Sequence, residues 1–504
     1  MHLFQKLKNS VQLNFGRPAF CINGLYYSYF DLAKSVAKIR LAIEQSTTDN
    51  EKIIGVIAND DIETYASIIA LWFSGKAYVP INPDNPLDRN ENIILQSGIK
   101  TIIDSSVNPN LYSVKLIDSK NLPETIINLT PNVVSDDELV YILFTSGTTG
   151  IPKGVPISRL NLTAFVAAFE EMNLKINEYD RCLQMFELTF DLSVFSYLIP
   201  LLKGACVYTI PKDKIKYSYI FELMEEQRLT VSLMVPSMLH YLRNYFNEIN
   251  LPLMKYSMFC GEALPFDITK EWSNCLPNAA IYNMYGPTED TIFCTQYAFE
   301  KNGDNTTYHG VLSIGVAMEG TITIIIDDDN NLLPIGEIGQ LCLGGSQLTP
   351  GYWNNEEKNK ESFFLTNYNG INQRFYKTGD LCISDDQGDL LYLGRIDFQT
   401  KIQGFRVELS EIEFHAKAFL GKINLVAIAF TDFIGNSEVG LVIESIEFHI
   451  ESLVDYLKSK IPGYMIPKSF VFLKEFPLNS NGKIDRKVLG TLLKDNFLVA
   501  VTQA

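Results

Sequence analysis

Residues 144–154, FTSGTTGIPKG, combine three glycines, three threonines, one serine and one lysine directly after the apolar run LVYIL. Glycines let successive backbone N–H groups point into one concavity, hydroxyls add donors, and Lys153 adds a positive charge, so this composition suits a phosphate site. The spacing is not that of a G-x-x-x-x-G-K-[ST] loop, because Lys153 follows Gly150 by three residues and no serine or threonine comes next. A polar surface loop with a lysine at its rim is the alternative interpretation.

The residues before this loop alternate between strand-like and helix-like patterns. IIGVIAN (53–59), AYVPI (77–81) and TIIDS (101–105) read as buried strands, whereas residues 61–77 carry apolar side chains at helical spacing that ends near a glycine. Strand, helix and strand in this order predict a parallel sheet with helices packed on it.

The pattern changes twice towards the C-terminus. Residues 321–345 hold the turn cluster DDDNN between two β-like runs, which predicts an antiparallel or barrel-like piece. Residues 398–504 carry twelve basic and twelve acidic side chains, so the whole net charge of −17 lies in residues 1–397. We therefore predict an α/β fold with a large domain over 1–396 and a small α+β domain over 397–504.

Composition excludes several classes of protein. The 59 acidic residues outnumber 42 basic ones, which disfavours nucleic acid as a partner. Eight cysteines and five histidines are scattered along the sequence without a C-x-x-C pair, so neither a zinc site nor a disulfide framework is expected. The cysteines are expected to be reduced thiols in a cytoplasmic protein. The N-terminus lacks the apolar region of a signal peptide, and no apolar run approaches the ~20 residues of a membrane span.

Nine motifs, the glycine-rich loop among them, occur in an order that resembles the adenylate-forming enzymes, the superfamily of acyl-CoA synthetases, luciferases and nonribosomal peptide adenylation domains. The resemblance covers nearly the whole chain and implies an acetyl-CoA synthetase-like fold: two layered α/β subdomains, a small β-barrel-like piece and a mobile C-terminal domain. The motifs are FSGKAYVPIN (73–82), FTSGTTGIPKG (144–154), FDLS (190–193), NMYGPTE (283–289), GEIGQLCLGG (336–345) with PGYW (350–353), YKTGD (376–380), GRIDFQTKIQGFRVELSEIE (394–413), PGYMIP (462–467) and NGKIDR (481–486).

The resemblance implies ATP and Mg²⁺ and assigns individual roles to residues of these motifs. Tyr285 is expected to stack on adenine, Asn283 to hydrogen-bond its edge, Asp380 to accept both ribose hydroxyls, and Glu289 to hold Mg²⁺ on the phosphates. The residues expected at the nucleotide are Thr145, Ser146, Gly147, Thr148, Thr149, Gly150, Lys153, Gly261, Glu262, Ala263, Asn283, Met284, Tyr285, Gly286, Pro287, Thr288, Asp380, Tyr392, Leu393, Gly394, Arg395 and Lys483.

Lys483, in the turn NSNGKIDR, matches the lysine that this family uses for adenylation. Attack of a carboxylate on the α-phosphorus joins two anions, and a preorganised cation there stabilises the transition state more than the ground state. Lys483 and Glu289 are therefore the predicted catalytic residues, and Lys483 is also expected to contact the amino acid. Without the resemblance, a single lysine in such a turn would be interpreted as a solvent-exposed residue with no catalytic role.

Asp191 in FDLS determines the predicted substrate class, because amino-acid-activating members of the family use an acid here to pair with the substrate ammonium. An N-cap of the following helix is the structural alternative, and both roles can coexist. The side-chain pocket carried over from the family contains no charged residue, which disfavours a charged substrate. It is formed by Leu192, Phe195, Leu233, Met258, Cys260, Met284, Ile292 and Phe293.

MFCGEALP (258–265) further resembles the D-alanine–carrier protein ligases, in which a cysteine at the position of Cys260 narrows the site. Phe195, Met284 and Phe293 are larger than that subgroup would suggest. A second half-reaction is implied, in which Asp397 acts as a hinge and Gly404 flanks the pantetheine arm of a separate carrier protein. Lys458, Lys460 and Lys468 are candidate contacts to that acidic carrier.

The sequence thus predicts a cytoplasmic, monomeric ligase that activates a small apolar amino acid, D-alanine being favoured, and passes it to a carrier protein. A stand-alone adenylation enzyme for an apolar L-amino acid is the nearest alternative. An acyl-CoA ligase is disfavoured by Asp191. A catalytically silent ATP-binding protein is disfavoured because Lys483, Glu289 and Asp380 are all present.

Overall fold

The computed structural model describes residues 2–108, 112–147, 150–397, 399–421, 423–477 and 484–503, without the side chains of 498–503. The chain divides into two compact units. The first comprises Met1–Pro83, Ile94–Phe144 and Gly154–Ile396, and the second comprises Asp84–Ile93, Thr145–Lys153 and Asp397–Ala504. Two short segments far upstream of Asp397 therefore group with the C-terminal residues.

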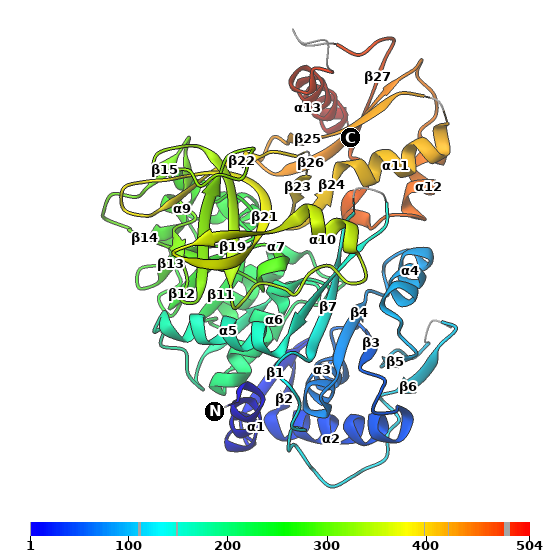
Figure 1. Cartoon of the computed structure of the whole chain (residues 1–504), viewed down its shortest axis with the longest axis vertical. Helices are drawn as coiled ribbons and strands as arrows, with labels where there is room; N and C mark the ends of the chain where they lie inside the picture. Colours follow the sequence, from blue (N-terminus) through cyan, green and yellow to red (C-terminus); the bar gives the residue numbers. More distant parts are fainter. Residues whose placement is uncertain are drawn as a thin grey trace. The chain divides into compact units, whose positions relative to one another are not determined.

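The largest sheet of the first unit has nine strands among the described residues, and its central strands run parallel (Figure 1). Its spatial order is β17 (Val316–Ala317), β14 (Thr295–Phe299), β13 (Ala280–Tyr285), β12 (Tyr256–Phe259), β11 (Val231–Met234), β9 (Arg181–Gln184), β10 (Cys206–Thr209), β1 (Pro18–Ile22) and β2 (Leu25–Ser28).

A second sheet, with six strands in the part of the chain described, contains the strands predicted near the N-terminus. Its order is β6 (Lys115–Asp118), β5 (Thr101–Asp104), β3 (Ile53–Ile57), β4 (Ala77–Ile81), β7 (Leu139–Thr145) and β8 (Lys153–Ser158). β3 pairs in parallel with both β4 and β5, as the alternating pattern predicted. The intervening helix α3 (Ile62–Ser74) begins after Asp61, whose side chain accepts a hydrogen bond from Thr64 N, and ends at Gly75 in the left-handed conformation.

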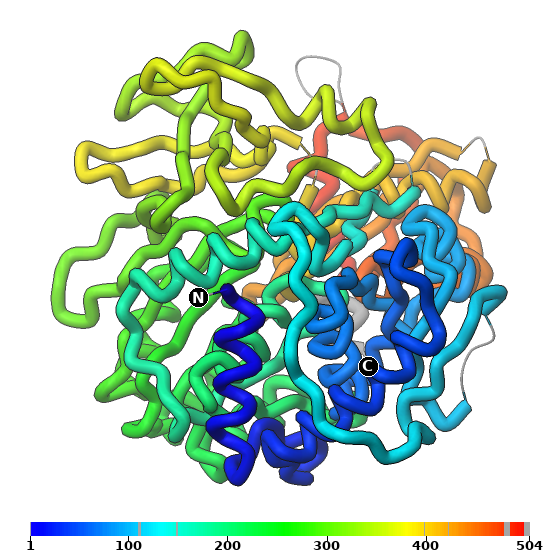
Figure 2. The backbone as a smooth tube through the Cα atoms, turned by 60° about the horizontal axis from the view of Figure 1, so that its bottom comes forward, coloured from blue at the N-terminus to red at the C-terminus, as the bar shows by residue number. Residues whose placement is uncertain are grey.

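Helices cover these sheets and form two large apolar cores with them. α1 (Leu3–Leu13) packs against α2 (Tyr29–Ser46) and α6 (Asp191–Lys203), and Figure 2 shows it in dark blue beside the N label. The other helices of this unit are α5 (Arg159–Glu171), α7 (Lys216–Glu226), α8 (Ser237–Leu242), α9 (Phe266–Cys275), α10 (Glu356–Ser362) and the short turns η1 (Arg243–Tyr245) and η2 (Thr288–Asp290). One core is formed with α1, α2, α3, α5 and α6 and the other with α7, α8 and α9. α4 (Leu87–Ser97) contributes residues to both units.

The region expected to be barrel-like is an open antiparallel sheet of five strands over the described residues. Its order is β18 (Thr321–Ile326), β19 (Gly339–Gly345), β21 (Ile371–Ser384) and β20 (Phe363–Tyr368), with β22 (Leu390–Arg395) on β21 and the pair β15 (Thr307–Tyr308) and β16 (Val311–Leu312) separate. The predicted hairpin over 321–345 is present as β18 paired with β19. The sheet does not close into a barrel, because β18 and β20 remain its two ends.

The second unit has a three-stranded sheet and a two-stranded one within its described residues. They are formed by β25 (Leu425–Thr431), β26 (Ser437–Glu444) and β27 (Ser469–Leu473), and by β23 (Gln399–Ile402) and β24 (Phe405–Glu408). Alternate residues of β25 bury on opposite faces, Leu425 and Ala427 with α11 (Leu409–Leu420) and α12 (Glu451–Lys458), and Val426 and Ile428 with α13 (Arg486–Gln503). η3 (Gly463–Met465) precedes β27.

No helix among the described residues is both long enough and apolar enough to cross a membrane. All eight cysteines are buried free thiols.

Candidate functional site

Eight of the predicted site residues of the first unit lie just beyond the carboxyl ends of the parallel strands β12 and β13. Cys260–Ala263 follow β12, and β13 ends at Tyr285, where Gly286–Glu289 continue into η2. Ligands of open α/β sheets bind at such strand ends. Gly286 cannot carry a side chain here, because an added Cβ would lie 2.3 Å from the Cα of Phe293.

Asp380 connects two other predicted nucleotide residues, Tyr285 and Arg395. The register of β21 and β22 places Asp380 opposite Arg395, whose Nη1 donates to Asp380 Oδ1 at 2.8 Å, while the hydroxyl of Tyr285 donates to Oδ2 at 2.5 Å. Burial and the charge of Asp380 raise the pKa of Tyr285 well above its usual value, so the phenol stays protonated. A buried two-oxygen acceptor is thus held in place by a phenol and a guanidinium.

Glu289 is fully buried, and its Oε1 accepts a 2.6 Å hydrogen bond from the hydroxyl of Tyr352, which itself lies 3.3 Å from the hydroxyl of Tyr376. Among the described residues, no group of three or more His, Cys, Asp or Glu side chains could hold a metal ion. One fixed carboxylate nevertheless fits Mg²⁺, which commonly binds through one or two carboxylates together with substrate phosphates. Glu289 therefore remains the candidate ligand.

Two of the other residues predicted around the nucleotide, Asn283 and Glu262, are placed by hydrogen bonds. Asn283 Nδ2 donates to the carbonyl of Ser313 at 2.9 Å, and Glu262 Oε2 accepts from Ser237 N at 2.8 Å. Gly261 and Glu262 are half-buried and Ala263 is exposed. Tyr392, Leu393 and Gly394 lie on β22, next to Arg395 on the same strand.

Asp191 is the first residue of α6 and is 6% exposed. Phe190 occupies the N-cap position and no side chain caps this helix, so the N-cap interpretation of Asp191 is wrong. Burial, together with the charge of Asp191, raises the pKa of Tyr78 and of Tyr141. The carboxylate therefore lies among buried phenols.

The eight predicted pocket residues are each at most 6% exposed. Phe195 and Phe293 lie with ring centroids 5.2 Å apart, and Phe165 and Phe169 of α5 pack edge-on against them, at 4.9 Å from Phe293 and 5.0 Å from Phe195 respectively. The sequence did not single out Phe165 and Phe169 as part of this wall. Their i, i+4 spacing on a helix is the signal, although that spacing is equally typical of an ordinary core.

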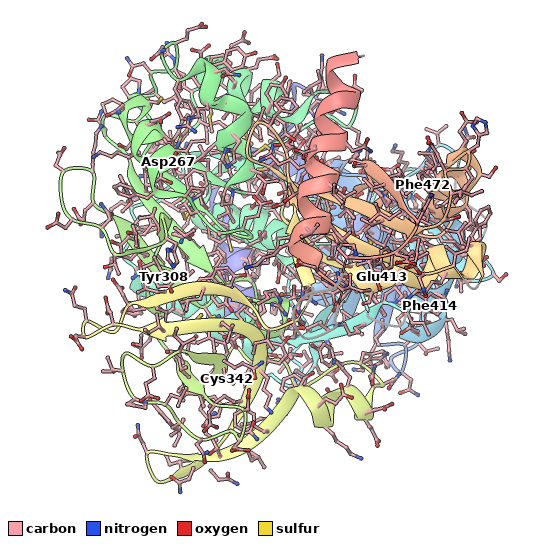
Figure 3. All side chains as sticks on the ribbon, turned by 90° about the horizontal axis from the view of Figure 1, so that it is seen from above. Asp267, Tyr308, Cys342, Glu413, Phe414 and Phe472 are labelled. Atoms are coloured by element: carbon pink, nitrogen blue, oxygen red, sulfur yellow. The ribbon has the colours of Figure 1, made fainter. Side chains whose placement is uncertain are left out.

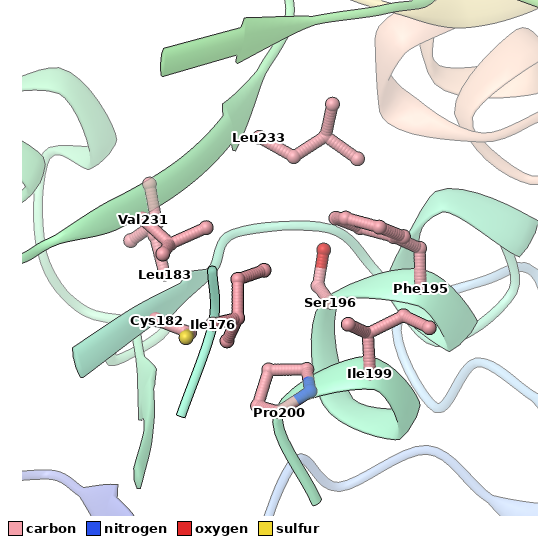
Figure 4. A pocket seen from close by; sticks show the side chains of 9 residues that line it. All are labelled: Ile176, Cys182, Leu183, Phe195, Ser196, Ile199, Pro200, Val231 and Leu233. Carbon is pink, nitrogen blue, oxygen red and sulfur yellow. The ribbon is translucent and has the colours of Figure 1, made fainter. Parts of the chain in front are cut away.

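A cavity of about 10 Å³ lies behind Phe195 and Leu233, as Figure 4 shows. Its lining is apolar apart from Ser196, whose hydroxyl donates to the carbonyl of Leu192 at 2.8 Å. This volume is about that of one water molecule and cannot receive an aromatic ring. Phe195 is therefore held in place from both sides.

The turn after η2 is strained and braced. Thr291 and Ile292 have φ of +53° and +76°, a conformation that costs roughly 1–3 kcal/mol for a residue other than glycine. Gln347 Nε2 donates to the carbonyls of Asp290, Thr291 and Phe293 at 3.2, 3.4 and 3.0 Å. Gln347 lies in the segment SQL, and the sequence did not predict this bracing role for its side chain.

The glycine-rich loop belongs to the second unit, and Thr148 and Thr149 lie outside the described residues. Thr145 ends β7 and Lys153 begins β8. Ser146 Oγ donates to the carbonyl of Arg406 at 2.8 Å, Gly147 N donates to Glu411 Oε2 at 3.2 Å, and Lys153 Nζ lies 3.3 Å from Glu408 Oε1. Every one of these loop donors is directed to the segment 406–411.

The predicted residues of the C-terminal segment are placed only in part. Lys483 lies outside the described residues. Asp397 is exposed and its Oδ1 accepts from Gln399 N at 3.1 Å, and Gly404 forms the turn between β23 and β24 with φ of +84°. The hinge role of Asp397 and the pantetheine role of Gly404 stay predictions.

Comparison with known proteins places these features in one family. The chain is 32% identical to tyrocidine synthase 1 of Brevibacillus parabrevis, over 94% of this chain, and it spans less than half of that protein, 43% of its length. It is 30% identical to D-alanine--D-alanyl carrier protein ligase of Bacillus anthracis, over 94% of this chain and 96% of that protein. The crystal structure of the Vibrio cholerae adenylation domain AlmE in complex with glycyl-adenosine-5'-phosphate has the same fold, with a TM-score of 0.86 over 98% of both chains at 24% identity. The AMP-binding enzyme family matches residues 7–353, more than half of the sequence, and the chain therefore belongs to that family.

Proposed function

We propose that this protein activates a small apolar amino acid, with D-alanine favoured, as an aminoacyl adenylate and then transfers it to the phosphopantetheine thiol of a separate carrier protein. The observation that carries the proposal is the pairing of a buried carboxylate, Asp191, with a closed apolar wall. The carboxylate provides a partner for the α-ammonium group, and the wall leaves little room beyond Cβ. The similarity to a carrier protein ligase over nearly its full length supports the same activity.

The two half-reactions use the site residues in different ways. In the first, the amino acid carboxylate attacks the α-phosphorus of ATP, the new O–P bond forms, and pyrophosphate leaves. Lys483 acts on the charge that gathers on the α-phosphate oxygens, and Asp380 with Arg395 orients the ribose. Glu289 would hold Mg²⁺, which would neutralise charge on the phosphates. In the second half-reaction, the carrier thiol attacks the acyl carbon and AMP leaves.

Glycine is a second candidate substrate. Phe195 and Phe293 are in tilted ring contact within the pocket wall, Phe165 and Phe169 pack edge-on against them, and the cavity behind Phe195 is too small for its ring to withdraw. A wall of this kind admits a hydrogen atom as well as a methyl group and disfavours the larger apolar L-amino acids. AlmE, the structural neighbour named above, was solved with a glycyl adenylate.

The test is amino-acid-dependent exchange of pyrophosphate into ATP, measured with glycine, both alanine enantiomers, L-valine and L-phenylalanine. Exchange with D-alanine well above the others supports the favoured assignment, and exchange with glycine alone selects the second candidate. Exchange with L-phenylalanine or with no amino acid contradicts the proposal. Asp191→Asn, which keeps the shape but removes the charge, is expected to raise the KM of the amino acid at least about tenfold.

The carrier protein is proposed from the chemistry of the second half-reaction. Two of the three lysines considered for its docking already form ion pairs within the second unit: Lys460 Nζ lies 2.5 Å from Asp88 Oδ2, and Lys458 Nζ lies 3.5 Å from Asp455 Oδ1. Lys468 is exposed, with Glu438 as an acidic neighbour, and is the first of the three to reverse, with Lys468→Glu expected to slow carrier loading while pyrophosphate exchange stays unchanged.

A further inference from the structure

The donors of the glycine-rich loop are engaged by carboxylates of the same unit. Gly147 N donates to Glu411 Oε2, and the ammonium of Lys153 pairs with Glu408 Oε1. Both carboxylates are buried, Glu411 completely and Glu408 at 5% exposed. A backbone N–H in a glycine-rich turn and a lysine ammonium are the donors that hold phosphate groups in proteins. Glu408 and Glu411 thus present anionic oxygens to the same kinds of group that would bind phosphate oxygens.

Packing reinforces these polar contacts. Gly150 has φ of +76°, and a Cβ added there would lie 2.6 Å from Cδ1 of Phe414 and 3.3 Å from Nε2 of His415. Phe414 and Glu413 follow each other on α11 (Figure 3). Glu413 accepts from Ala427 N at 3.0 Å and so ties α11 to β25, on which the helix packs. The loop therefore rests on a helix that is itself fixed within the unit.

Each carboxylate has a second partner that does not belong to the loop. Arg89 Nη1 donates to Glu411 Oε1 at 2.6 Å, and both side chains of this pair are at most 6% exposed. Gln399 Nε2 donates to Glu408 Oε1. If the loop let go, Glu411 would keep a cationic partner and Glu408 a neutral hydrogen-bond donor, so neither carboxylate would be left without a polar partner, although Glu408 would lose the charge of Lys153. The contact between the glycine-rich loop and these two carboxylates can therefore break and form again.

We propose that Glu408 and Glu411 are internal anionic ligands of the glycine-rich loop, which compete with pyrophosphate for Gly147 N and Lys153 Nζ. The inference rests on the proposed function in one respect, that this loop binds the phosphates of ATP. Phosphates and carboxylates then occupy the loop in turn: ATP displaces the carboxylates, and departure of pyrophosphate lets them return. The two glutamates set how tightly the loop holds pyrophosphate, and their return after its departure opposes the reverse reaction.

The competition predicts a gain of affinity when the glutamates lose their charge. If the carboxylates occupy the loop in about nine molecules of ten, removing them raises the apparent affinity for a competing anion about tenfold. The experiment is calorimetric titration of the full chain with inorganic pyrophosphate, for the wild-type protein, Glu408→Gln and Glu411→Gln. Glu451→Gln is the matched control, because Glu451 is an exposed acid at the start of α12 in the same unit.

Tighter binding of pyrophosphate by Glu408→Gln, with Glu451→Gln unchanged, supports the inference. Unchanged or weaker binding by Glu408→Gln overturns it, as does an absence of pyrophosphate binding in all four proteins. A lower Tm with unchanged affinity would assign the contact a merely structural role. If Glu411→Gln fails to fold because Arg89 is left without its partner, Glu408→Gln alone decides, since its loop contact does not involve Arg89.

The titration needs no turnover, so it remains informative if the proposed function fails. A wild-type protein that exchanges pyrophosphate with no amino acid contradicts the proposed function, while a pyrophosphate affinity that rises in Glu408→Gln still supports the internal ligands. Where exchange does occur, the KM for pyrophosphate is expected to fall in both glutamine variants in parallel with the dissociation constant.

Discussion

The amino acid pocket and the glycine-rich loop are built by opposite means. The pocket wall consists of four phenylalanines in edge and tilted contact, and the strained turn beside it is fixed by three hydrogen bonds from Gln347 to backbone carbonyls. Nothing that enters the pocket can replace these contacts. The loop is held instead by two carboxylates, for which phosphate oxygens are direct substitutes. On the proposed function, selectivity for the substrate would reside in fixed packing, and handling of the nucleotide in exchangeable charge.

The largest effect is expected from Lys483→Ala, which should affect the rate of the chemical step much more than the binding of the amino acid. Lys483→Ala should lower the rate of aminoacyl adenylate formation by about a hundredfold or more, because a cation that acts on transition-state charge is lost. The KM of the amino acid should change far less, since the pocket wall is untouched. Rapid-quench measurement of adenylate formation checks this, with Lys474→Ala, an exposed lysine of the same unit, as the control. Full activity in Lys483→Ala would contradict the assignment.

Asp380→Asn tests whether the fixed hydrogen bonds of the first unit act independently of the glycine-rich loop. The substitution removes the charged acceptor that holds Tyr285 and Arg395, and hydrogen bonds to charged groups contribute roughly 1.5–3 kcal/mol each. The KM for ATP should therefore rise at least about tenfold. Pyrophosphate binding to the loop should stay at the wild-type value, and a parallel loss of both affinities would show that the two regions are not independent.

Phe293→Leu should relax the pocket without disturbing the loop. A smaller side chain at this position opens space next to Phe165 and Phe195, and a difference of about one methylene in an apolar pocket shifts specificity roughly tenfold or more. The ratio of kcat/KM for L-valine to that for alanine, from pyrophosphate exchange, is the measurement. An unchanged ratio would mean that Phe293 does not bound the substrate.

The smallest expected effect is a pH dependence of stability in the first unit. Burial raises the pKa of Asp60 to about 7, despite a hydrogen bond from Tyr65 and the nearby charges of Lys212 and Lys216. A carboxyl group whose folded pKa lies above its unfolded value stabilises the fold below about pH 4 and loses that contribution as the pH rises to about 7. Tm of the wild-type protein should fall across this window relative to Asp60→Asn. Asparagine tolerates the φ of +57° at this position, so the backbone is not perturbed. Parallel Tm curves for the two proteins would contradict the shifted pKa.

Local signals allowed much of the fold to be predicted from the sequence. β4 was predicted with its observed bounds, and α3 was recognisable from its apolar spacing and its terminal glycine. The N-cap interpretation of Asp191 failed because Phe190 occupies the N-cap position, so Asp191 already lies in the first turn of the helix. The open edge of the sheet at β18 and β20 could not be foreseen, since closure depends on the register of strands far apart in the chain.

The residues that support the site were harder to predict than those expected to touch substrate. Gly147 and Glu411 are 264 positions apart, and no periodicity or spacing connects them. The sequence around Gln347 gives no sign of a special role for this residue. Its role in fixing the turn is evident only from the structure, in which three backbone carbonyls accept hydrogen bonds from its amide. Tyr352 lay inside a recognised motif, but its hydrogen bond to Glu289 needed coordinates.

The water-sized cavity behind Phe195 has a consequence for fidelity. An immovable wall turns away ligands that are too long, yet it has no means of refusing one that is too short, because a missing methyl group forfeits only a modest amount of binding energy. If D-alanine is the physiological cargo, mischarging by glycine is the error this architecture cannot correct by shape. Accuracy would then depend on the relative abundance of the two amino acids and on how fast each adenylate is handed on.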